Sequence, residues 1–324
     1  MKFLIFSDLH RSPNFDAGTY EDLTFFKERA KREGCDFIIH GGDLCHGPTY
    51  KDNADFVRAY NELDIPTYHC IGNHDADHST FEEVLEHYKM ESECYYIDGD
   101  GARLIVLNPN YYYEDGKYFN YSNGNYYYKD RDHFPPEQLE WLKEAIESSE
   151  NPCILLSHPS VERENGVKNR EAVLDIIGSA NARKKHSVVM YINGHTHKDH
   201  MRVMDGVCYF EINSASFEIL EHRHSHYPKE LCKRIRDINA TLVINDPICA
   251  VVEVNRNTID VKGMKSSFFM NVTKDMTDDP FFDEAGRPAT AEIKDFHVVV
   301  EARGYIPRCT FCCMTHDEKA TFRH

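Results

Sequence analysis

Three stretches near the N-terminus decide the fold class: KFLIFSDLH at residues 2–10, DFIIHGGD at residues 36–43 and TYHCIGNHD at residues 67–75. Each begins with a short run typical of a buried strand and ends abruptly in polar residues. Helical spacing of apolar residues lies between them, over 21–33 and 52–63, and returns after them at 80–88. This alternation predicts an α/β protein built from βαβ units, with helices covering a sheet.

The rest of the chain continues this pattern. Helical spacing recurs at 136–148 and 170–179. The second half is richer in hairpins, which indicates a second sheet. Further strands are expected at residues 103–107, 153–157, 187–192, 207–212, 250–254 and 258–261.

Composition and charge restrict the class of partner. Acidic residues outnumber basic ones by 54 to 37, which gives a formal charge of −17. Such a surface repels nucleic acid, so a nuclease is disfavoured. The N-terminus has no signal peptide pattern, no apolar run is long enough for a membrane span, and the 11 cysteines are scattered and odd in number. We therefore expect reduced thiols, a cytoplasmic protein and no membrane partner; the sequence leaves homodimer formation open.

Metal-ligating residue types follow the predicted strands in short polar segments. They comprise carboxylates, an amide and imidazoles, a donor set that suits Mn, Fe, Zn, Co or Ni rather than a thiolate zinc site. If the segments are extended, residues two apart point the same way, so Asp8/His10 and His195/His197 each converge. The candidate residues are Asp8, His10, Asp43, Asn73, His74, His158, His195 and His197.

This set is too large for one ion but suits two ions that share a carboxylate. Two metals about 3.5–4 Å apart form the usual clamp for displacement at phosphorus. Asp8, Asp43 and a bridging hydroxide would leave two divalent ions with a net positive charge, which attracts a phosphate ester despite the acidic surface. We expect two divalent transition-metal ions as cofactors, with Mn, Fe and Zn favoured.

The order Asp-Leu-His, Gly-Gly-Asp-Leu, Gly-Asn-His-Asp, Ser-His-Pro and Gly-His-Thr-His resembles the calcineurin-like metallophosphoesterase superfamily. Two further phrases, at residues 136–142 and 212–216, resemble bacterial members related to class III cyclic-nucleotide phosphodiesterases. The resemblance covers most of residues 1–262. It implies a four-layer sandwich of two mixed sheets flanked by helices, with a catalytic domain over 1–264 and an extension of unknown role over 265–324.

The resemblance also implies a role for each site residue. Asp8, His10, Asp43 and His197 would hold one metal, and Asp43, Asn73, His158 and His195 the other, with Asp43 as the bridge. His74 would contact the phosphate and protonate the leaving oxygen.

Two residues beside these ligands extend or limit the resemblance. Asp75 could orient His74 and raise its pKa. Purple acid phosphatases carry a tyrosine ligand three residues after the bridging aspartate, and this chain has His46 there, so a redox-active purple site is not expected.

The expected reaction is hydrolysis of a small phosphodiester, such as a cyclic nucleotide, by a metal-bridging hydroxide. The alternatives are a phosphomonoesterase or a nuclease of the same superfamily and, from another class, a non-catalytic binding scaffold. A tyrosine-rich segment over residues 110–133 is expected to form a long surface loop or hairpin. Its rings either pack on the domain or form a stacking rim for a nucleobase.

Overall fold

The computed structural model describes residues 1–11, 18–46, 50–220, 222–235, 237–255, 258–277 and 286–300. Its first sheet is mixed: β1 runs parallel to β2 and antiparallel to β15. The strand order is β19 (Phe296–Val299), β16 (Thr258–Lys262), β15 (Ala250–Val254), β1 (Lys2–Phe6), β2 (Phe37–His40) and β3 (Thr67–His69).

The second sheet is also mixed, with a parallel centre and an antiparallel strand at each edge. Its strand order is β11 (His200–Met204), β12 (Val207–Glu211), β10 (Val188–Asn193), β9 (Cys153–Leu156), β5 (Ala102–Val106) and β4 (Tyr95–Gly99). The edge strands β4 and β11 were not predicted from the sequence.

Side-chain alternation explains how the two sheets stack. In β1, Phe3 and Ile5 point into the core between the sheets, whereas Leu4 and Phe6 point to the opposite face. In β5, Leu104 faces that shared core and Ile105 the outer face. Because the central strands are buried on both faces, their sequences are continuous apolar runs.

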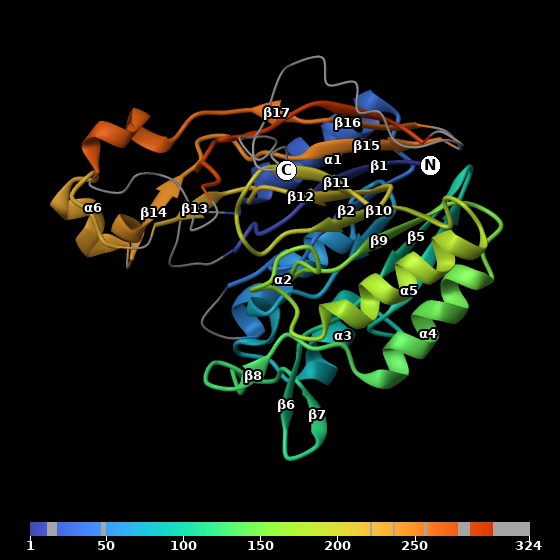
Figure 1. Ribbon diagram of the computed structural model, residues 1–324. Helices are drawn as coiled ribbons and strands as arrows, with labels where there is room; N and C mark the ends of the chain where they lie inside the picture. The colour runs from blue at the N-terminus through green and yellow to red at the C-terminus, as the bar shows by residue number, and fades with distance from the viewer. Residues whose placement is uncertain are drawn as a thin grey trace, which may run out of the picture.

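Helices cover the two outer faces. The first face packs against α1 (Tyr20–Glu33), α2 (Tyr50–Asn61) and α3 (Phe81–Tyr88). The second packs against α4 (Pro136–Glu147) and α5 (Arg170–Arg183), which lie side by side in Figure 1. The predicted sandwich of two mixed sheets flanked by helices is therefore confirmed.

Smaller elements decorate this sandwich. The tyrosine-rich segment is the predicted hairpin, which projects at the bottom of Figure 1 and consists of β6 (Tyr111–Glu114), β7 (Lys117–Asn120) and the short β8 (Asp130–Arg131). A small lobe with its own apolar cluster lies at the left. It contains β13 (Phe217–Ile219), α6 (Lys229–Arg234), the 3-10 turn η2 (Ile238–Ala240) and β14 (Thr241–Val243).

Part of the predicted extension joins the sandwich. β19 pairs with β16 at the edge of the first sheet, and β18 (Glu292–Ile293) pairs with β17 (Met264–Lys265). Two 3-10 turns, η3 (Phe269–Asn271) and η4 (Lys274–Met276), lie between these strands in the chain. The domain boundary at residue 264 stays a prediction, and residues 301–324 lie outside the described part of the chain.

Two further expectations concern thiols and membranes. The eight cysteines within the described residues are all free, and the expectation of reduced thiols stays a prediction. Within the same residues, no helix combines the length and the apolar character that crossing a bilayer requires.

Candidate metal centre

The predicted metal ligands all lie in loops that follow strands. Asp8, Asp43 and Asn73 follow the parallel strands β1, β2 and β3 of the first sheet. His158 and the His195–His197 pair follow the parallel strands β9 and β10 of the second. Ligand sites in such folds lie outside the carboxyl ends of strands, and here loops from both sheets supply the side chains.

One group of donors consists of Asp8, His10 and His197, whose ligand atoms lie within 4.8 Å of one another. The Nε2 atoms of the two histidines are 3.1 Å apart. Oδ1 of Asp8 lies 3.3 Å from Nε2 of His197 and 3.8 Å from Nε2 of His10. All three residues are buried, so the group is shielded from bulk water.

A second group consists of Asp43, His158 and His195, and a third, which shares His10 with the first, consists of His10, His46 and His74. Nε2 of His158 lies 3.0 Å from Oδ2 of Asp43, and its ring is 5.1 Å from that of His195. The same Asp43 oxygen is 3.8 Å from Nε2 of His10, in the first group. Asp43 therefore occupies the position between the first and second groups that the resemblance assigns to the bridging ligand.

The backbone around these side chains is left-handed rather than extended. Positive φ angles occur at Asp8 (53°), His10 (51°), Asp43 (51°), His195 (73°) and His197 (55°). The expectation that each i, i+2 pair converges because its segment is extended is therefore wrong: Oδ1 of Asp8 and Nε2 of His10 do lie 3.8 Å apart, but His195 and His197 belong to different donor groups. Such conformations cost about 1–3 kcal/mol each outside glycine and persist only where surrounding contacts enforce them.

A glycine makes close packing of the two sheets' loops feasible. Gly42 has a φ of +104°, and an added Cβ there would lie 2.3 Å from Nδ1 of His158. Only a residue without a side chain allows the β2 loop to approach the His158 ring so closely.

Gly42→Ala is expected to lower the free energy of unfolding by about 1–3 kcal/mol, the range for overfilling a packed site. Gly178→Ala in α5 is the matched control, because an added Cβ there meets nothing within 4 Å. Urea unfolding followed by circular dichroism measures both variants. Equal stability of the two alanine variants would contradict the close packing at Gly42.

Backbone carbonyls fix the orientation of two candidate histidines. Nδ1 of His158 lies 2.8 Å from the carbonyl oxygen of Gly41, and Nδ1 of His197 lies 2.6 Å from that of Phe217. Each Nδ1–H therefore donates outward, which leaves the Nε2 lone pair directed at the centre. This arrangement is typical of metal-binding histidines.

Unsatisfied polar atoms show that the centre fits a cation. Oδ1 of Asp8, Oδ1 of Asn73 and Nε2 of His158 are buried without a hydrogen-bond partner within the described residues. Buried polar atoms are normally satisfied, so three such atoms on candidate ligands indicate a missing partner. A divalent transition-metal ion fits this oxygen and nitrogen set.

The electrostatics lead to the same conclusion. Burial opposes the charged forms of Asp8 and Asp43, yet the neighbouring imidazoles hold both carboxyl pKa values below their usual range. Burial likewise opposes a charged His158, but Asp43 and Asp8 raise its pKa to about 10. By contrast, burial lowers the pKa of His195 to about 4. The two buried carboxylates thus favour positive charge between them: a protonated His158 supplies it when no ion is bound, and a bound cation would replace that proton and free the Nε2 lone pair.

The partner of His74 differs from the expected one. The Asp75 carboxylate accepts hydrogen bonds from the backbone amides of Gly72, Asp43 and Cys45 at 2.8, 3.1 and 3.2 Å, so it secures the loops. Asp77 instead lies beside the His74 ring, with Oδ2 2.7 Å from Nδ1. The expected pairing of Asp75 with His74 is therefore wrong.

Asp77 was not predicted from the sequence, although its spacing of three residues from His74 was a usable signal. His74–Ala76 forms a 3-10 turn, η1, in which residues three apart lie above one another.

Burial opposes protonation of His74, but Asp43 and Asp77 outweigh it and raise the His74 pKa. The His74 side chain is 24% exposed, so a substrate can reach its ring.

The tyrosine-rich segment contacts this part of the site. Tyr126 is buried and its hydroxyl donates to Oδ1 of Asp77. Its ring stacks on Tyr121 at 4.1 Å and on Tyr127 at 4.6 Å between centroids. The packing interpretation therefore holds for the two buried rings, whereas Tyr127 is 48% exposed and Tyr128 is fully exposed.

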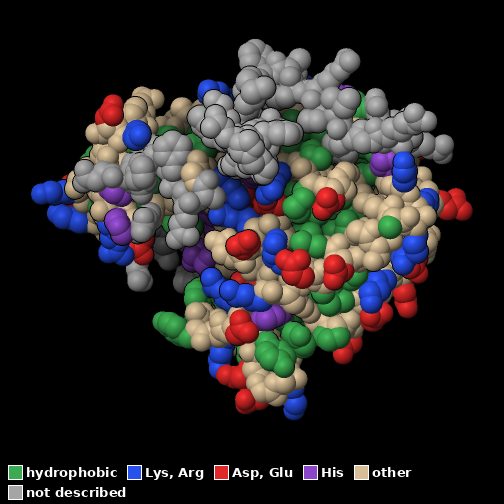
Figure 2. Space-filling view, viewed as in Figure 1, with side chains coloured by type: hydrophobic (Ala, Val, Ile, Leu, Met, Phe, Trp, Pro, Cys, Tyr) green, Lys and Arg blue, Asp and Glu red, His purple; other side chains and the backbone are tan. Residues whose placement is uncertain are grey.

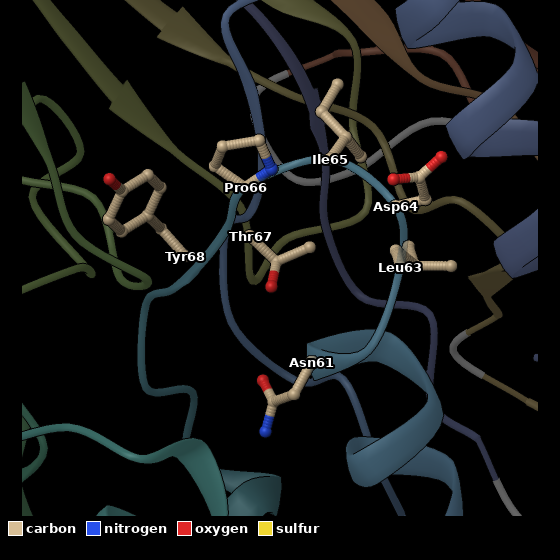
Figure 3. A pocket seen from close by; sticks show the side chains of 7 residues that line it. All are labelled: Asn61, Leu63, Asp64, Ile65, Pro66, Thr67 and Tyr68. Atoms are coloured by element: carbon tan, nitrogen blue, oxygen red, sulfur yellow. The ribbon is translucent and has the colours of Figure 1, made fainter.

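A separate surface cavity of about 640 Å³ lies at the turn between α2 and β3. Figure 3 shows its lining, which contains none of the predicted site residues: Asn61, Leu63, Asp64, Ile65, Pro66, Thr67 and Tyr68. Histidine side chains are visible elsewhere on the surface, between the small lobe and the hairpin in Figure 2. The candidate centre is thus distinct from this cavity.

The sequence model of the calcineurin-like phosphoesterase family matches residues 1–199. The chain belongs to this family and is a hydrolase that acts on phosphoric ester bonds. The match includes every segment that supplies a candidate ligand. No curated protein matches the chain significantly.

Solved structures share the fold at low sequence identity. A dimetal phosphatase from Danio rerio is 13% identical, with a TM-score of 0.58 over 83% of this chain and 98% of its own. An anchor protein of the inner membrane complex of Plasmodium is 15% identical, with a TM-score of 0.52 over 81% and 84%. At these identities the likeness establishes the fold alone.

Proposed function

We propose that this chain hydrolyses phosphoesters with two divalent transition-metal ions, of which Mn, Fe and Zn are favoured. Asp8, His10 and His197 hold one ion and Asn73, His158 and His195 the other, with Asp43 shared between them. The observation that carries this proposal is the pair of buried donor groups joined by Asp43, with unsatisfied atoms directed between them.

The ions supply a Lewis acid and a nucleophile that forms from water near neutral pH. The residues of the chain position these ligands and bind the ester. His74 is held at Nδ1 by Asp77, so its Nε2 is available to the substrate. We assign it contact with the transferring phosphoryl group and protonation of the leaving oxygen. Asp75 acts indirectly, because it holds the loops that carry Asp43 and His74.

A small phosphodiester is the proposed substrate class, with cyclic nucleotides first. The phrase at residues 212–216 carries part of the resemblance, and its Ser214 and Ser216 hydroxyls donate to the Asp8 carbonyl oxygen at 2.8 and 3.1 Å. Next to His197, the ammonium group of Lys198 pairs with the carboxylate of Glu218. A diester carries one negative charge fewer than a monoester dianion, so it suits a site whose neighbouring lysine is already paired.

The chain is expected to hydrolyse bis-(4-nitrophenyl) phosphate with a higher kcat/KM than 4-nitrophenyl phosphate. Both release the same chromophore, so absorbance compares them directly under identical metal loading. A clear preference for the monoester would replace the diesterase proposal by the phosphomonoesterase alternative and leave the hydrolase assignment intact. Activity on single-stranded DNA exceeding both would favour the nuclease alternative.

The non-catalytic scaffold, the alternative from another class, is supported only by a likeness in fold. The Plasmodium neighbour is described as an anchor, although that likeness establishes the fold alone. Metal analysis of protein purified without chelator separates the two candidates. Two transition-metal ions per chain would support the hydrolase, and fewer than one would count against it.

A further inference from the structure

His46 lies between two residues of the proposed site. Its Nδ1 is 3.4 Å from Nδ1 of His10, and its ring stacks on His74 with centroids 4.4 Å apart and planes 16° apart. Its Nε2 is 3.9 Å from Oδ2 of Asp77, the oxygen that also contacts His74. One imidazole thus touches both a proposed metal ligand and the proposed acid.

His10 differs from the other histidines in what secures its ring. His158 and His197 donate their Nδ1–H to backbone carbonyls, whereas Nδ1 of His10 faces the imidazole of His46. A metal on Nε2 of His10 requires the proton on Nδ1, and that proton then needs an acceptor. The lone pair on Nδ1 of His46 provides it.

With this tautomer the proton positions along the group are consistent. His46 accepts at Nδ1 and carries its own proton on Nε2, which faces Asp77. Asp77 in turn accepts from Nδ1–H of His74 and from the hydroxyl of Tyr126. With the protons placed in this way, every contact in the group pairs a donor with an acceptor, so no additional proton is needed.

The backbone holds His46 in place independently of its ring. The amide of Arg11 donates to the carbonyl oxygen of Leu44 at 2.9 Å, and the amide of His46 donates to that of Arg11 at 2.7 Å. These bonds tie the loop after β2 to the loop after β1. The side chain of His46 is 44% exposed, so replacing it leaves no large void in the core.

We infer that His46 is a positioning residue that fixes the metal-binding tautomer of His10 through Nδ1 and the ring of His74 by stacking. This inference rests on the proposed function. The His46 side chain thus makes two contributions: a hydrogen-bond acceptor for His10 and a flat surface for His74.

Two variants divide these contributions. His46→Phe keeps a flat ring against His74 and removes the acceptor for His10. His46→Asn keeps an acceptor, because its side-chain oxygen lies near the position of Nδ1, but removes the ring. His78→Phe is the matched control, since His78 is an exposed histidine in the same region that we place outside the site.

MnCl2 is titrated by calorimetry into each chelator-treated protein, and kcat is then measured with bis-(4-nitrophenyl) phosphate at saturating Mn²⁺. His46→Phe is expected to weaken one of two Mn²⁺ sites by about 10–100-fold, the usual effect of losing an outer partner of a metal ligand. His46→Asn is expected to bind Mn²⁺ like the wild type but to have a lower kcat.

The inference is overturned if His46→Phe binds Mn²⁺ like His78→Phe, or if Phe and Asn weaken both sites equally. Thermal unfolding of each variant shows whether a loss of Mn²⁺ affinity or of kcat comes from misfolding. If a variant misfolds, His46→Gln is measured in its place. Wild-type protein that binds neither Mn²⁺ nor Zn²⁺ nor Fe²⁺ would instead refute the proposed function, and this result is read before any variant is compared.

Discussion

Asp43→Ala is expected to abolish phosphoester hydrolysis while the chain stays folded. The Asp43 carboxylate lies between the two donor groups, 3.0 Å from His158 and 3.8 Å from His10, so both proposed ions lose a ligand at once. We expect kcat/KM to fall by at least about a thousandfold, which corresponds to roughly 4 kcal/mol in the barrier. Steady-state kinetics and metal analysis measure the loss together.

Two further variants make this result specific. Asp64→Ala removes an exposed carboxylate that pairs with Lys31 on the surface, and it should leave both kinetics and metal content unchanged. Asp43→Asn keeps the shape and an oxygen acceptor for the amide of His74, so a loss in this variant reports the missing charge. Activity of Asp43→Ala within about tenfold of wild type, roughly 1.4 kcal/mol, would refute the bridging role.

His74→Ala is expected to reduce hydrolysis by an amount that depends on the leaving group. A general acid contributes typically about 10²–10⁴-fold, and its contribution is needed most when the departing oxygen is strongly basic. We therefore expect a loss in that range with an alkyl phosphodiester. A much smaller loss is expected with a 4-nitrophenyl ester, because that oxygen leaves readily without a proton.

The role of His74 is tested by comparing the loss of activity on the two esters. His78→Ala serves as the control for removal of a neighbouring exposed imidazole and should hydrolyse both esters normally. An equal loss on both esters would assign His74 to phosphate binding alone. Full activity on both esters would remove His74 from the site altogether.

The sequence predicted the central strands and the flanking helices because their patterns are local. Continuous apolar runs such as Phe37–His40 are buried on both faces, and their polar ends are abrupt. The edge strands were missed for the opposite reason. β4 and β11 contain only half-buried and exposed residues and no continuous buried run, and their pairing partners are specified by the rest of the sheet rather than by their own sequence.

The candidate ligands were predictable for a similar reason, since each follows a recognisable strand. The environment of these ligands was not predictable from the sequence. The contact of Tyr126 with Asp77 joins residues 49 positions apart, and nothing near either one in the sequence specifies it. The left-handed backbone at Asp8 or His195 is likewise imposed by neighbouring loops, because the residues themselves disfavour it. Local patterns thus selected the candidate ligands, whereas long-range packing determines how they are arranged.

The division of the ligands between the two sheets has a consequence for folding. His10 and His197 are 187 residues apart, so their meeting closes a long loop, and the entropic cost of closure grows with loop length. An ion bound between them would link the loops of the two sheets, since it would bind only after both sheets have come together. By mass action, its free concentration then sets how firmly the halves stay closed. Metal supply would thus govern the lifetime of this protein as well as its chemistry.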